Sequence, residues 1–369
     1  MPKSNPRVLF IGGFKPANDG AVGGQFYACS TLVNSPIKEH IKFIKIDSTV
    51  ASVPPPALIV RVIPAISRVL KVIYFLSSSK VDSVLVFTAH GASLLEKGLI
   101  VFIARLFRKK TVTFPRSGFL IDECKRSRFW RWYTRMVFRH SNWVVCQGDY
   151  WRQGFIELLG LPEGKFITIM NWLDISEYNS LFSVAPDNGE LRILFMGWVD
   201  QDKGIIEFVN SIAKLRSRLG NVRVTIAGKG NALDAAKNLV GKYQLEDYVN
   251  FPGWVIGDKK EELIKRSHIF VLPSYAEGMP NALLEAMAAK KAVISTSVGA
   301  IPDVLKNFEN GLLIPPRDED ALTRALETCI EDRDLVTRLS ENARKSIEKN
   351  HDIESAWVSV FRLLDGSRV

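Results

Sequence analysis

The sequence predicts an α/β protein with two domains, each built around a parallel sheet. Short apolar runs alternate with helix-length segments along the chain, which is the pattern of parallel strands joined by crossover helices. The alternation occurs twice, on either side of a polar stretch at residues 176–190 that contains Pro and Gly. At 369 residues the chain is long for a single core and sufficient for two.

Six strands are expected in each half of the chain. Those of the first half are RVLFIGG, IKFIKI, SVLVFTA, KKTVTF, NWVVCQG and FITIM. Those of the second half are RILFMGW, VRVTIAGKG, VNFPGW, HIFVLP, AVISTS and GLLIPP. With the linker in the polar stretch, the predicted domains are residues 1–178 and residues 190–350.

The net charge of +10 is unevenly distributed. Residues 1–180 have 24 Lys and Arg against 12 Asp and Glu, whereas residues 181–369 have 25 against 27. A basic first half suggests that this half meets a polyanion, which could be an anionic membrane surface, a phosphate-bearing acceptor or a nucleic acid.

The cysteines and the apolar segments indicate in which cellular compartment the protein is expected. The four cysteines lie far apart with no C-x-x-C pair, which is typical of reduced thiols in a cytosolic protein and argues against a metal or disulfide site. The apolar run Val8–Ile11 is too short for a signal peptide. The longest apolar stretch, Ala57–Leu76, contains three basic residues, so no membrane-spanning helix is expected.

The stretch PSYAEGMPNALLEAMAAKK, from Pro273, is the most informative motif. The run IFVLP before it predicts a buried strand, and ALLEAMAAKK predicts a helix for which Pro280 suits the first position. Glu277 then lies on a loop at the carboxyl edge of a sheet, where open α/β folds bind ligands. Glu285 lies about one turn into the helix.

The start of this helix is suited to a phosphate group. The N–H groups around Met279 and Asn281 are expected to face outward there, at the positive end of the helix dipole, and Pro280 between them has no N–H. A nucleotide-sugar site needs carboxylates that accept hydrogen bonds from hydroxyl groups, and it needs backbone amides beside them that bind phosphate.

At these residues the chain resembles the retaining glycosyltransferases of GT-B architecture, the glycosyltransferases group 1 family. The family motif E-G-x-P-x-x-x-x-E-A-M-A is matched from Glu277 to Ala288, and FMGWVDQDKG supplies a second block. The resemblance is strong over residues 191–326 and only in outline before them. It implies two Rossmann-like domains with parallel sheets facing across a cleft, and a C-terminal helix within residues 351–369 that returns to the first domain.

The resemblance also implies donor contacts. Glu285 would accept hydrogen bonds from the ribose, and Glu277 would contact the donor sugar near its reacting carbon. Lys203 would hold the diphosphate and neutralise the leaving nucleotide. Gly278 and its neighbours up to Asn281 would line the donor. For both glutamates and the lysine an ordinary surface or capping role is the alternative.

The chain departs from the family pattern after Gly197. The family commonly has Arg at the next position, and this chain has Trp198, so one charge of an Arg–Lys clamp is missing unless another cation replaces it. Trp198 could stack on the donor. Trp254 falls where the family lines the base pocket, although a core aromatic is equally compatible with the sequence. Gly228 lies in a turn expected near the donor.

The first domain offers weaker candidates. By resemblance, Gly23 and Gly24 end a glycine-rich loop that approaches the donor, with a plain tight turn as the alternative. His90 is the candidate for catalysis or acceptor binding, because Arg116 and Ser117 occupy the loop where many family members carry a histidine. A structural role for His90 stays open, and retaining transfer needs no protein base if the leaving phosphate takes the proton.

The segment Lys125–His140 is the strongest basic feature. Its spacing predicts one helix with its arginines on a stripe and its aromatic residues pointing mostly elsewhere. Such a helix favours a membrane-surface element, or alternatively an ordinary helix with a solvated arginine face. The arginines are Arg128, Arg131, Arg135 and Arg139, and the aromatic residues include Phe129, Trp132 and Tyr133.

Together these observations predict a retaining hexosyl-type glycosyltransferase of cell-surface polysaccharide or lipopolysaccharide synthesis. The expected partners are a nucleotide diphosphate-sugar donor, a glycan or lipid-linked acceptor and an anionic membrane surface, with no nucleic acid, no cofactor and no metal. The expected location is the cytoplasm, on the inner face of the cell membrane. The alternatives are a nucleotide-sugar epimerase of the same architecture and a non-enzymatic binder of membranes or nucleic acids.

Overall fold

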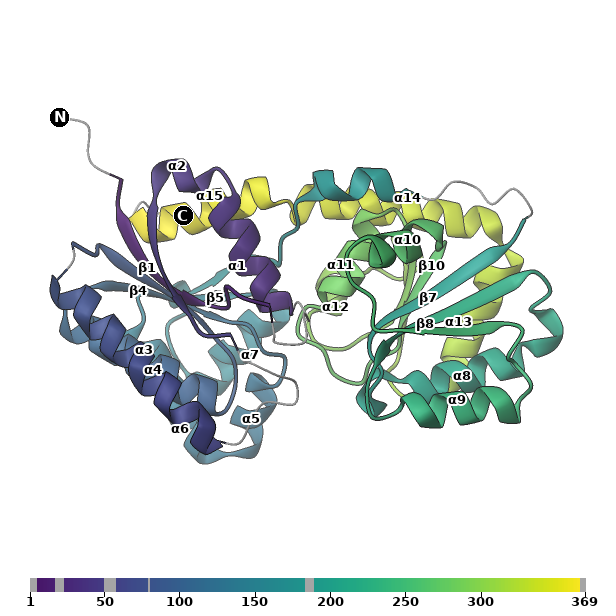
Figure 1. The fold of residues 1–369 in the computed structure, drawn as a ribbon, viewed down its shortest axis with the longest axis horizontal. Coiled ribbons are helices and arrows are strands. Elements are labelled where there is room, and N and C mark those ends of the chain that lie inside the picture. Colours follow the sequence, from purple (N-terminus) through teal and green to yellow (C-terminus); the bar gives the residue numbers. More distant parts are fainter. Residues whose placement is uncertain (1–4, 17–22, 50–57, 79, 183–188, 366–369) are drawn as a thin grey trace. The chain divides into compact units, whose positions relative to one another are not determined.

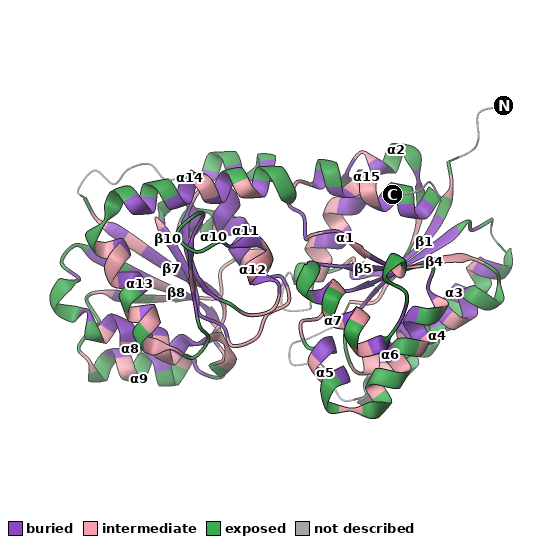
Figure 2. Ribbon diagram, turned by 180° about the vertical axis from the view of Figure 1, so that it is seen from behind, coloured by how far each residue is buried: buried purple, intermediate pink, exposed green. Residues whose placement is uncertain are grey.

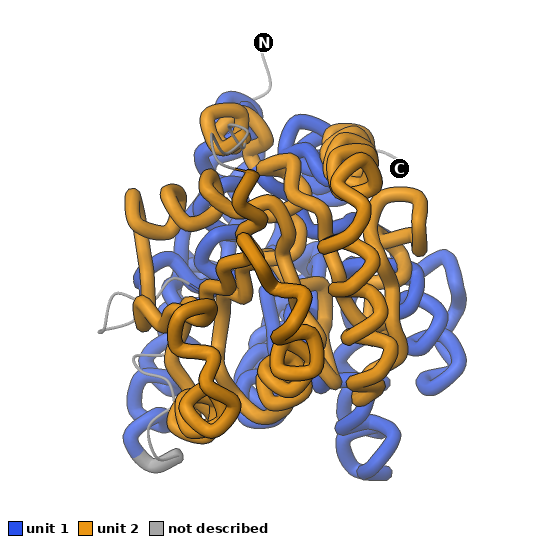
Figure 3. The backbone as a smooth tube through the Cα atoms, turned by 90° about the vertical axis from the view of Figure 1, so that its right-hand side faces the viewer, with its two compact units in different colours: residues 1–173, 351–369 blue, residues 174–350 orange. Residues whose placement is uncertain are grey.

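The computed structural model describes residues 5–16, 23–49, 58–78, 80–182 and 189–365. The chain forms two compact units (Figure 3): unit 1 comprises residues 1–173 and 351–369, and unit 2 comprises residues 174–350. The first division lies just before the polar stretch expected to link the domains, of which residues 183–188 lie outside the described part.

Unit 1 contains a six-stranded parallel sheet of order β2-β1-β3-β4-β5-β6 (Figure 1). Its strands are β1 (Arg7–Gly12), β2 (Lys42–Asp47), β3 (Ser83–Thr88), β4 (Lys110–Pro115), β5 (Trp143–Cys146) and β6 (Phe166–Thr168). Its helices are α1 (Gly24–Asn34), α2 (Ile37–His40), α3 (Leu58–Ser78), α4 (Ala92–Leu106), α5 (Leu120–Arg126), α6 (Arg128–His140), α7 (Asp149–Leu159) and α15 (Ile353–Asp365), with a short 3-10 turn at Glu163–Lys165.

Unit 2 contains a second six-stranded parallel sheet, of order β12-β11-β10-β7-β8-β9. Its strands are β7 (Leu191–Trp198), β8 (Val222–Lys229), β9 (Val249–Gly253), β10 (Ile269–Leu272), β11 (Ala292–Thr296) and β12 (Leu312–Ile314). Its helices are α8 (Ile205–Lys214), α9 (Leu233–Lys242), α10 (Asp258–Arg266), α11 (Asn281–Ala288), α12 (Ile301–Val304), α13 (Glu319–Glu331) and α14 (Arg333–Asn350), with 3-10 turns at Ile175–Leu181, Gln201–Lys203 and Arg216–Arg218.

The predicted fold class is confirmed: each half of the chain forms one parallel sheet from its six predicted strands. The central strands are apolar on both faces because crossover helices cover both sides of a parallel sheet. Every residue of β3 and of β10 is buried.

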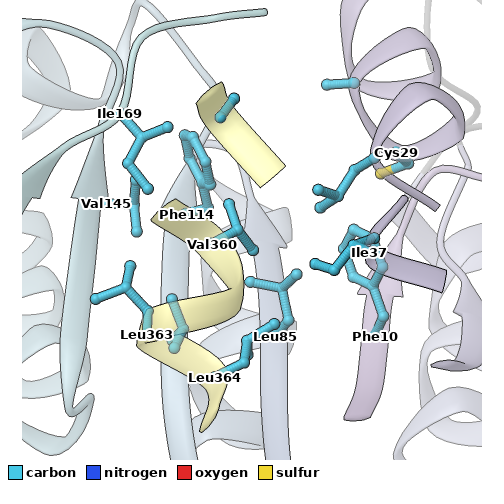
Figure 4. Close-up of a cluster of buried hydrophobic side chains, with 14 of the residues drawn as sticks. Phe10, Cys29, Ile37, Leu85, Phe114, Val145, Ile169, Val360, Leu363 and Leu364 are labelled. Atoms are coloured by element: carbon cyan, nitrogen blue, oxygen red, sulfur yellow. The ribbon is translucent and has the colours of Figure 1, made fainter. Parts of the chain in front are cut away.

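Helix α15 completes the core of unit 1. It brings Val360, Leu363 and Leu364 against apolar side chains of the sheet and of the first two helices, including Phe10 and Leu85 (Figure 4). A segment some 260 residues after β3 in sequence therefore supplies one side of this core.

The basic segment Lys125–His140 differs from the prediction, because it forms two helices rather than one. Ser127 adopts an extended conformation, ends α5 and caps α6 by accepting a hydrogen bond from the Trp130 N–H (3.4 Å). Phe129 and Trp132 are 53% and 58% exposed, so these two aromatic side chains do not pack into the core of unit 1.

Candidate active site

In unit 2 the candidate site lies where the strand order reverses. Strand β7 is paired with β8 on one side and with β10 on the other, so the loops after β7 and β10 leave the sheet next to each other. Open parallel sheets bind ligands at such switch points, beyond the carboxyl ends of the strands. Lys203 follows β7 and Glu277 follows β10, so the topology brings two residues that are 74 positions apart to one place.

The two loops are held together by backbone contacts. The Tyr275 N–H donates to the Asp202 carbonyl at 2.7 Å. Gly204 has a left-handed φ of 67°, and a Cβ atom at this position would lie 2.1 Å from the Pro273 carbonyl oxygen. Only glycine allows this approach, and the approach fixes Lys203, the preceding residue, against the Glu277 loop.

Glu277 collects two donors on one oxygen. Its Oε1 atom accepts from Lys203 Nζ and from the Ser274 hydroxyl, each at 2.8 Å. A third loop supports the backbone, because the Ala300 N–H donates to the Gly278 carbonyl at 2.9 Å and a Cβ on Gly299 would lie 2.0 Å from the Glu277 carbonyl oxygen. These contacts hold the Glu277 carboxylate at a defined position, and both of its side-chain hydrogen bonds are made by Oε1.

Glu285 is buried in helix α11, with 6% of its surface exposed. Its Oε2 atom forms an ion pair with Lys260 Nζ at 2.7 Å, and Lys260 comes from helix α10. Nothing in the sequence indicates this partner, because the two residues lie in different helices and meet only in the folded unit. A carboxylate this deeply buried requires a positive partner.

The start of helix α11 differs slightly from the prediction. The helix begins at Asn281, and Pro280 is the N-cap residue with an extended ψ of 118° rather than the first helical residue. Met279 is buried and Asn281 is half-buried. The N–H groups of the first turn lie directly after the Glu277 loop, as the phosphate interpretation requires.

Trp198, Trp254 and Lys229 form a second cluster in unit 2. The two indole rings lie 4.9 Å apart between centroids, and Lys229 Nζ lies 5.4 Å from the Trp198 ring and 5.2 Å from the Trp254 ring. Trp198 and Lys229 are register partners at the ends of β7 and β8. Sequence reasoning does not single out Lys229, because a lysine between Gly228 and Gly230 is also typical of an ordinary polar turn.

Gly228 has a packing role in this structure. A Cβ atom there would lie 1.9 Å from the Gly197 carbonyl oxygen, so the close approach of β7 and β8 requires glycine. The contact explains the residue without a ligand, and donor binding by Gly228 stays a prediction.

In unit 1, His90 and Ser117 meet at the ends of neighbouring strands. His90 follows β3 and Ser117 follows β4, and His90 Nδ1 lies 2.6 Å from the Ser117 hydroxyl oxygen. The His90 ring also contacts the Phe119 ring edge-to-face at 5.4 Å. His90 is exposed, so the pair is a polar group available at the sheet edge.

Arg116 points into the unit rather than forming a free surface charge. Its guanidinium group lies 5.0 Å from the centre of the Phe114 ring and 5.7 Å from that of Trp172, and it donates to Asn171 Oδ1 at 2.7 Å. Burial lowers the pKa of Arg116 to about 10, which leaves the group charged at neutral pH. These contacts give Arg116 a structural role beside the predicted acceptor role.

Gly23 and Gly24 begin helix α1. Gly23 is the N-cap and Gly24 the first helical residue, and both are exposed. A Cβ atom on Gly23 would meet no described atom within 4 Å, so the packing of the described residues does not require glycine there. Residues 17–22 of the same loop lie outside the described residues.

Neither a metal-binding cluster nor a membrane-spanning helix occurs among the described residues. Within the described ranges, no group of three or more His, Cys, Asp or Glu side chains could hold a metal ion. Of the helices in the described part of the chain, none is both long and apolar enough to cross a bilayer.

Comparison with solved structures defines the class of fold. Sucrose-phosphate synthase from Thermosynechococcus elongatus superposes with a TM-score of 0.78 at 16% identity, covering 98% of both chains. HepE of Anabaena, solved with UDP and glucose, gives a TM-score of 0.74 at 15% identity, covering 98% of this chain and 100% of HepE. At this identity the likeness shows the fold alone, which is the GT-B architecture with two parallel-sheet domains.

The sequence comparisons then give the family. A family model described as glycosyl transferases group 1 matches residues 179–346. An α-1,4-N-acetyl-D-galactosaminyltransferase of Campylobacter jejuni, which acts on a diNAcBac-PP-undecaprenol-linked acceptor, is 30% identical over 61% of this chain and 67% of its own. The uncharacterized glycosyltransferase MJ1607 of Methanocaldococcus jannaschii is 27% identical over 60% of each chain. The chain belongs to the glycosyl transferases group 1 family.

The matches cover only part of these relatives. The chain spans 60% of MJ1607 and 56% of WcaL of Escherichia coli, a putative colanic acid biosynthesis glycosyltransferase.

Proposed function

We propose that this protein is a retaining glycosyltransferase that moves a sugar from a nucleotide diphosphate-sugar to a hydroxyl of a glycan or lipid-linked glycan in cell-surface polysaccharide synthesis. The observation that carries the proposal is the pairing of Lys203 with Glu277 at the switch point of unit 2. Family membership and the UDP-bound HepE structure, which has the same fold, support it.

Glu285 is the anchor for the nucleotide. Its carboxylate would accept hydrogen bonds from the two ribose hydroxyls, and Lys260 offsets the charge of the buried group. Hydrogen bonds to a charged acceptor contribute about 1.5–3 kcal/mol. The N–H groups at the start of α11 would bind a phosphate oxygen of the same donor.

Lys203 and Glu277 would stabilise charges of opposite sign that develop during the reaction. The bond between the anomeric carbon and the phosphate oxygen breaks, and the acceptor oxygen bonds to the anomeric carbon from the same face. The acceptor proton passes to the departing phosphate oxygen. Lys203 stabilises the negative charge that develops on the diphosphate, and Glu277 binds sugar hydroxyls and stabilises the positive charge on the sugar ring.

Lys229 supplies the second positive charge that Trp198 leaves missing. It is held over the Trp198 and Trp254 rings at the end of the neighbouring strand, so a cation sits beside the position of the usual arginine. The two rings offer an apolar surface for a base or a sugar.

We assign the acceptor to unit 1, with His90 and Ser117 as its polar contacts. The undecaprenol-linked acceptor named for the Campylobacter jejuni relative supports a lipid-linked acceptor. A lipid-linked acceptor would locate the reaction at the inner face of the cell membrane. There the positive charge of residues 1–180 would be attracted to anionic lipid headgroups.

A panel of nucleotide diphosphate-sugars tests the proposal by calorimetry. One or more donors should bind, and Glu285→Gln should weaken that binding, whereas Glu262→Gln on the exposed surface of α10 should not. Failure of the whole panel to bind would overturn the proposal.

Product analysis separates the remaining alternatives. Nuclear magnetic resonance of the product should show the anomeric configuration of the donor retained, and inversion would refute the retaining mechanism. Incubation without acceptor should leave the donor sugar unrearranged, because conversion of the donor alone would identify an epimerase.

A further inference from the structure

Helix α3 has a wide apolar side exposed to solvent. Ile63, Leu70 and Tyr74 are 76%, 60% and 62% exposed, and Ile66 and Ile73 lie on the same side at helical spacing. The opposite side of the helix buries Val72 and Leu76 in unit 1. A helix that only covers a sheet places its apolar residues on the buried side, so the second apolar side of α3 needs another explanation.

The exposed surface continues over two neighbouring helices. Helix α3 contacts α4 through the Arg68–Glu96 ion pair, and α4 contacts α6 through the hydrogen bond from the Tyr133 hydroxyl to the Leu95 carbonyl (3.0 Å). The three helices lie side by side on unit 1 (Figure 1), and exposed residues recur along them (Figure 2). The exposed apolar residues of α4 and α6 and of the turn between α4 and β4 are Leu95, Leu99, Leu106, Phe107, Phe129 and Trp132.

The charges on this surface are almost entirely positive. Helices α3, α4 and α6 and the turn at residues 107–109 have eleven Lys and Arg residues, of which Lys97 is buried, and one carboxylate, Glu96. That carboxylate is neutralised by Arg68, at 2.6 and 2.9 Å, and by Lys97 at 3.2 Å. Arg128 and Arg135 are exposed on α6 beside the two exposed aromatic residues.

We propose that the surface of α3, α4 and α6 binds a lipid bilayer containing anionic lipids, with α3 lying in the plane of the interface. Aliphatic and aromatic side chains enter the boundary between headgroups and acyl chains, while Lys and Arg contact anionic headgroups. A nucleic acid offers nothing to the aliphatic residues of α3, and a mixed-charge protein surface does not explain the near absence of carboxylates.

This inference deepens the membrane part of the proposed function and changes the residues that carry it. The apolar face of α3 contributes most of the insertion, and Arg131 contributes less than its position in sequence suggested, because its guanidinium donates to the Cys124 carbonyl at 3.1 Å. Vesicle binding is measured without donor, so its failure is distinguishable from failure of donor binding.

The first test compares two pairs of exposed apolar residues. Ile63→Ser with Leu70→Ser should weaken co-sedimentation with vesicles of phosphatidylcholine and phosphatidylglycerol at least about tenfold, because two side chains no longer enter the apolar region. Ile256→Ser with Phe308→Ser, at exposed residues of unit 2, should leave binding unchanged. Equal binding by the two variants would overturn the proposal. Near-ultraviolet circular dichroism checks that both variants fold.

The second test removes charge. Arg128→Glu with Arg135→Glu should weaken binding to the anionic vesicles by more than about twentyfold, since each basic residue near such a surface strengthens binding roughly fivefold. Binding to vesicles of phosphatidylcholine alone should be weak for the unchanged protein. Equal binding to both kinds of vesicle would refute the part played by anionic lipids.

A site-specific label reports insertion directly. The four native cysteines are buried, so Ile63→Cys introduces an accessible thiol for an environment-sensitive fluorophore. Its emission should shift to shorter wavelength when anionic vesicles are added, and that of a label at Phe308→Cys should not. No shift at either position would overturn the proposal.

The competing occupant is a second copy of the chain. Light scattering should give the same oligomeric state for the unchanged protein and for Ile63→Ser with Leu70→Ser. An oligomer that dissociates in this variant, with vesicle binding unaffected, would assign the surface to self-association instead.

Discussion

The two units share a sheet of the same size and kind but differ in their outer surfaces. Of the large hydrophobic residues that are exposed in the described chain, fifteen lie in unit 1 and two, Ile256 and Phe308, lie in unit 2. Both sheets are covered by crossover helices, so the fold itself does not require apolar helix surfaces. The larger number of exposed hydrophobic residues in unit 1 therefore needs a cause other than the fold that both units share.

At the carboxyl edges of the sheets, unit 2 has more paired charged residues and more closely packed loops than unit 1. In unit 2 two glutamates are each paired with a lysine, at 2.8 and 2.7 Å, and three loops are fixed by close backbone contacts. In unit 1 the candidate side chains that meet at the sheet edge are a single pair, the exposed His90 and the half-buried Ser117. The comparison predicts that changes in unit 2 alter donor chemistry without altering vesicle binding, and that changes on α3 do the reverse.

The largest effect is expected for Lys203→Met. Loss of the charge beside the leaving diphosphate should lower the transfer rate by roughly 100- to 1,000-fold. Initial rates of nucleotide release measure this, and vesicle binding should be unchanged. Lys242→Met, at an exposed lysine of the same unit, is the control. A rate within a few-fold of the original would separate Lys203 from the chemistry.

Acid should destabilise both units through one histidine in each, which is buried in unit 1 and half-buried in unit 2. Burial lowers the pKa of His351 in unit 1 and of His268 in unit 2 to about 4. Between about pH 6.5 and pH 4 the unfolded chain binds a proton that the folded unit excludes, so stability falls as the pH falls, by up to about 3 kcal/mol for His351 and by less for the half-buried His268.

Chemical denaturation across this pH range measures the loss. His351→Gln should reduce the acid sensitivity of unit 1 and His268→Gln that of unit 2, whereas His40→Gln, at an exposed histidine, should change neither. An unchanged pH dependence of stability in both the His351 and the His268 variant would contradict the expectation.

Glu285→Gln should weaken donor binding by roughly ten- to a hundredfold, because charge-assisted hydrogen bonds to the ribose become neutral ones. Calorimetry with the donor identified from the panel measures this constant. The sharper comparison is with Lys260→Met, which should also weaken binding because it leaves the buried Glu285 carboxylate without its partner. If Lys260→Met weakens donor binding and Glu285→Gln does not, then Glu285 does not bind the ribose.

The smallest effect is expected in unit 1. His90→Ala and Ser117→Ala should each raise the KM for the acceptor about tenfold or less, since each removes one hydrogen-bonding group. Donor affinity, measured by calorimetry, should be unchanged. A loss of kcat with KM unchanged would move His90 from acceptor binding to catalysis.

The fold and the central motif could be predicted from the sequence because their signals are local. Each strand is a short apolar run, and Glu277 and Glu285 lie in one continuous motif. Lys260 and Lys229 could not be predicted because their partners come from other elements. Lys260 of α10 meets Glu285 of α11 in an ion pair, and Lys229 meets Trp198 through strand register.

The errors in the basic segment and on α3 have a related cause. One serine, Ser127, divides the predicted helix by capping its second part, and the spacing of the arginines does not reveal this. The apolar stretch at residues 57–76 indicates from its sequence only that a membrane-spanning helix is not expected. Whether its second apolar side is covered depends on the rest of the unit, which periodicity alone does not determine.

The contribution of α15 to the core of unit 1 has a consequence for the order of folding. Unit 2 is a continuous segment, so all of its sheet and helices are available once residue 350 has been synthesised. The core of unit 1 lacks Val360, Leu363 and Leu364 until residues 353–365 follow. During translation the segment that begins first is therefore completed last, and its unfinished apolar surface is exposed while unit 2 is made.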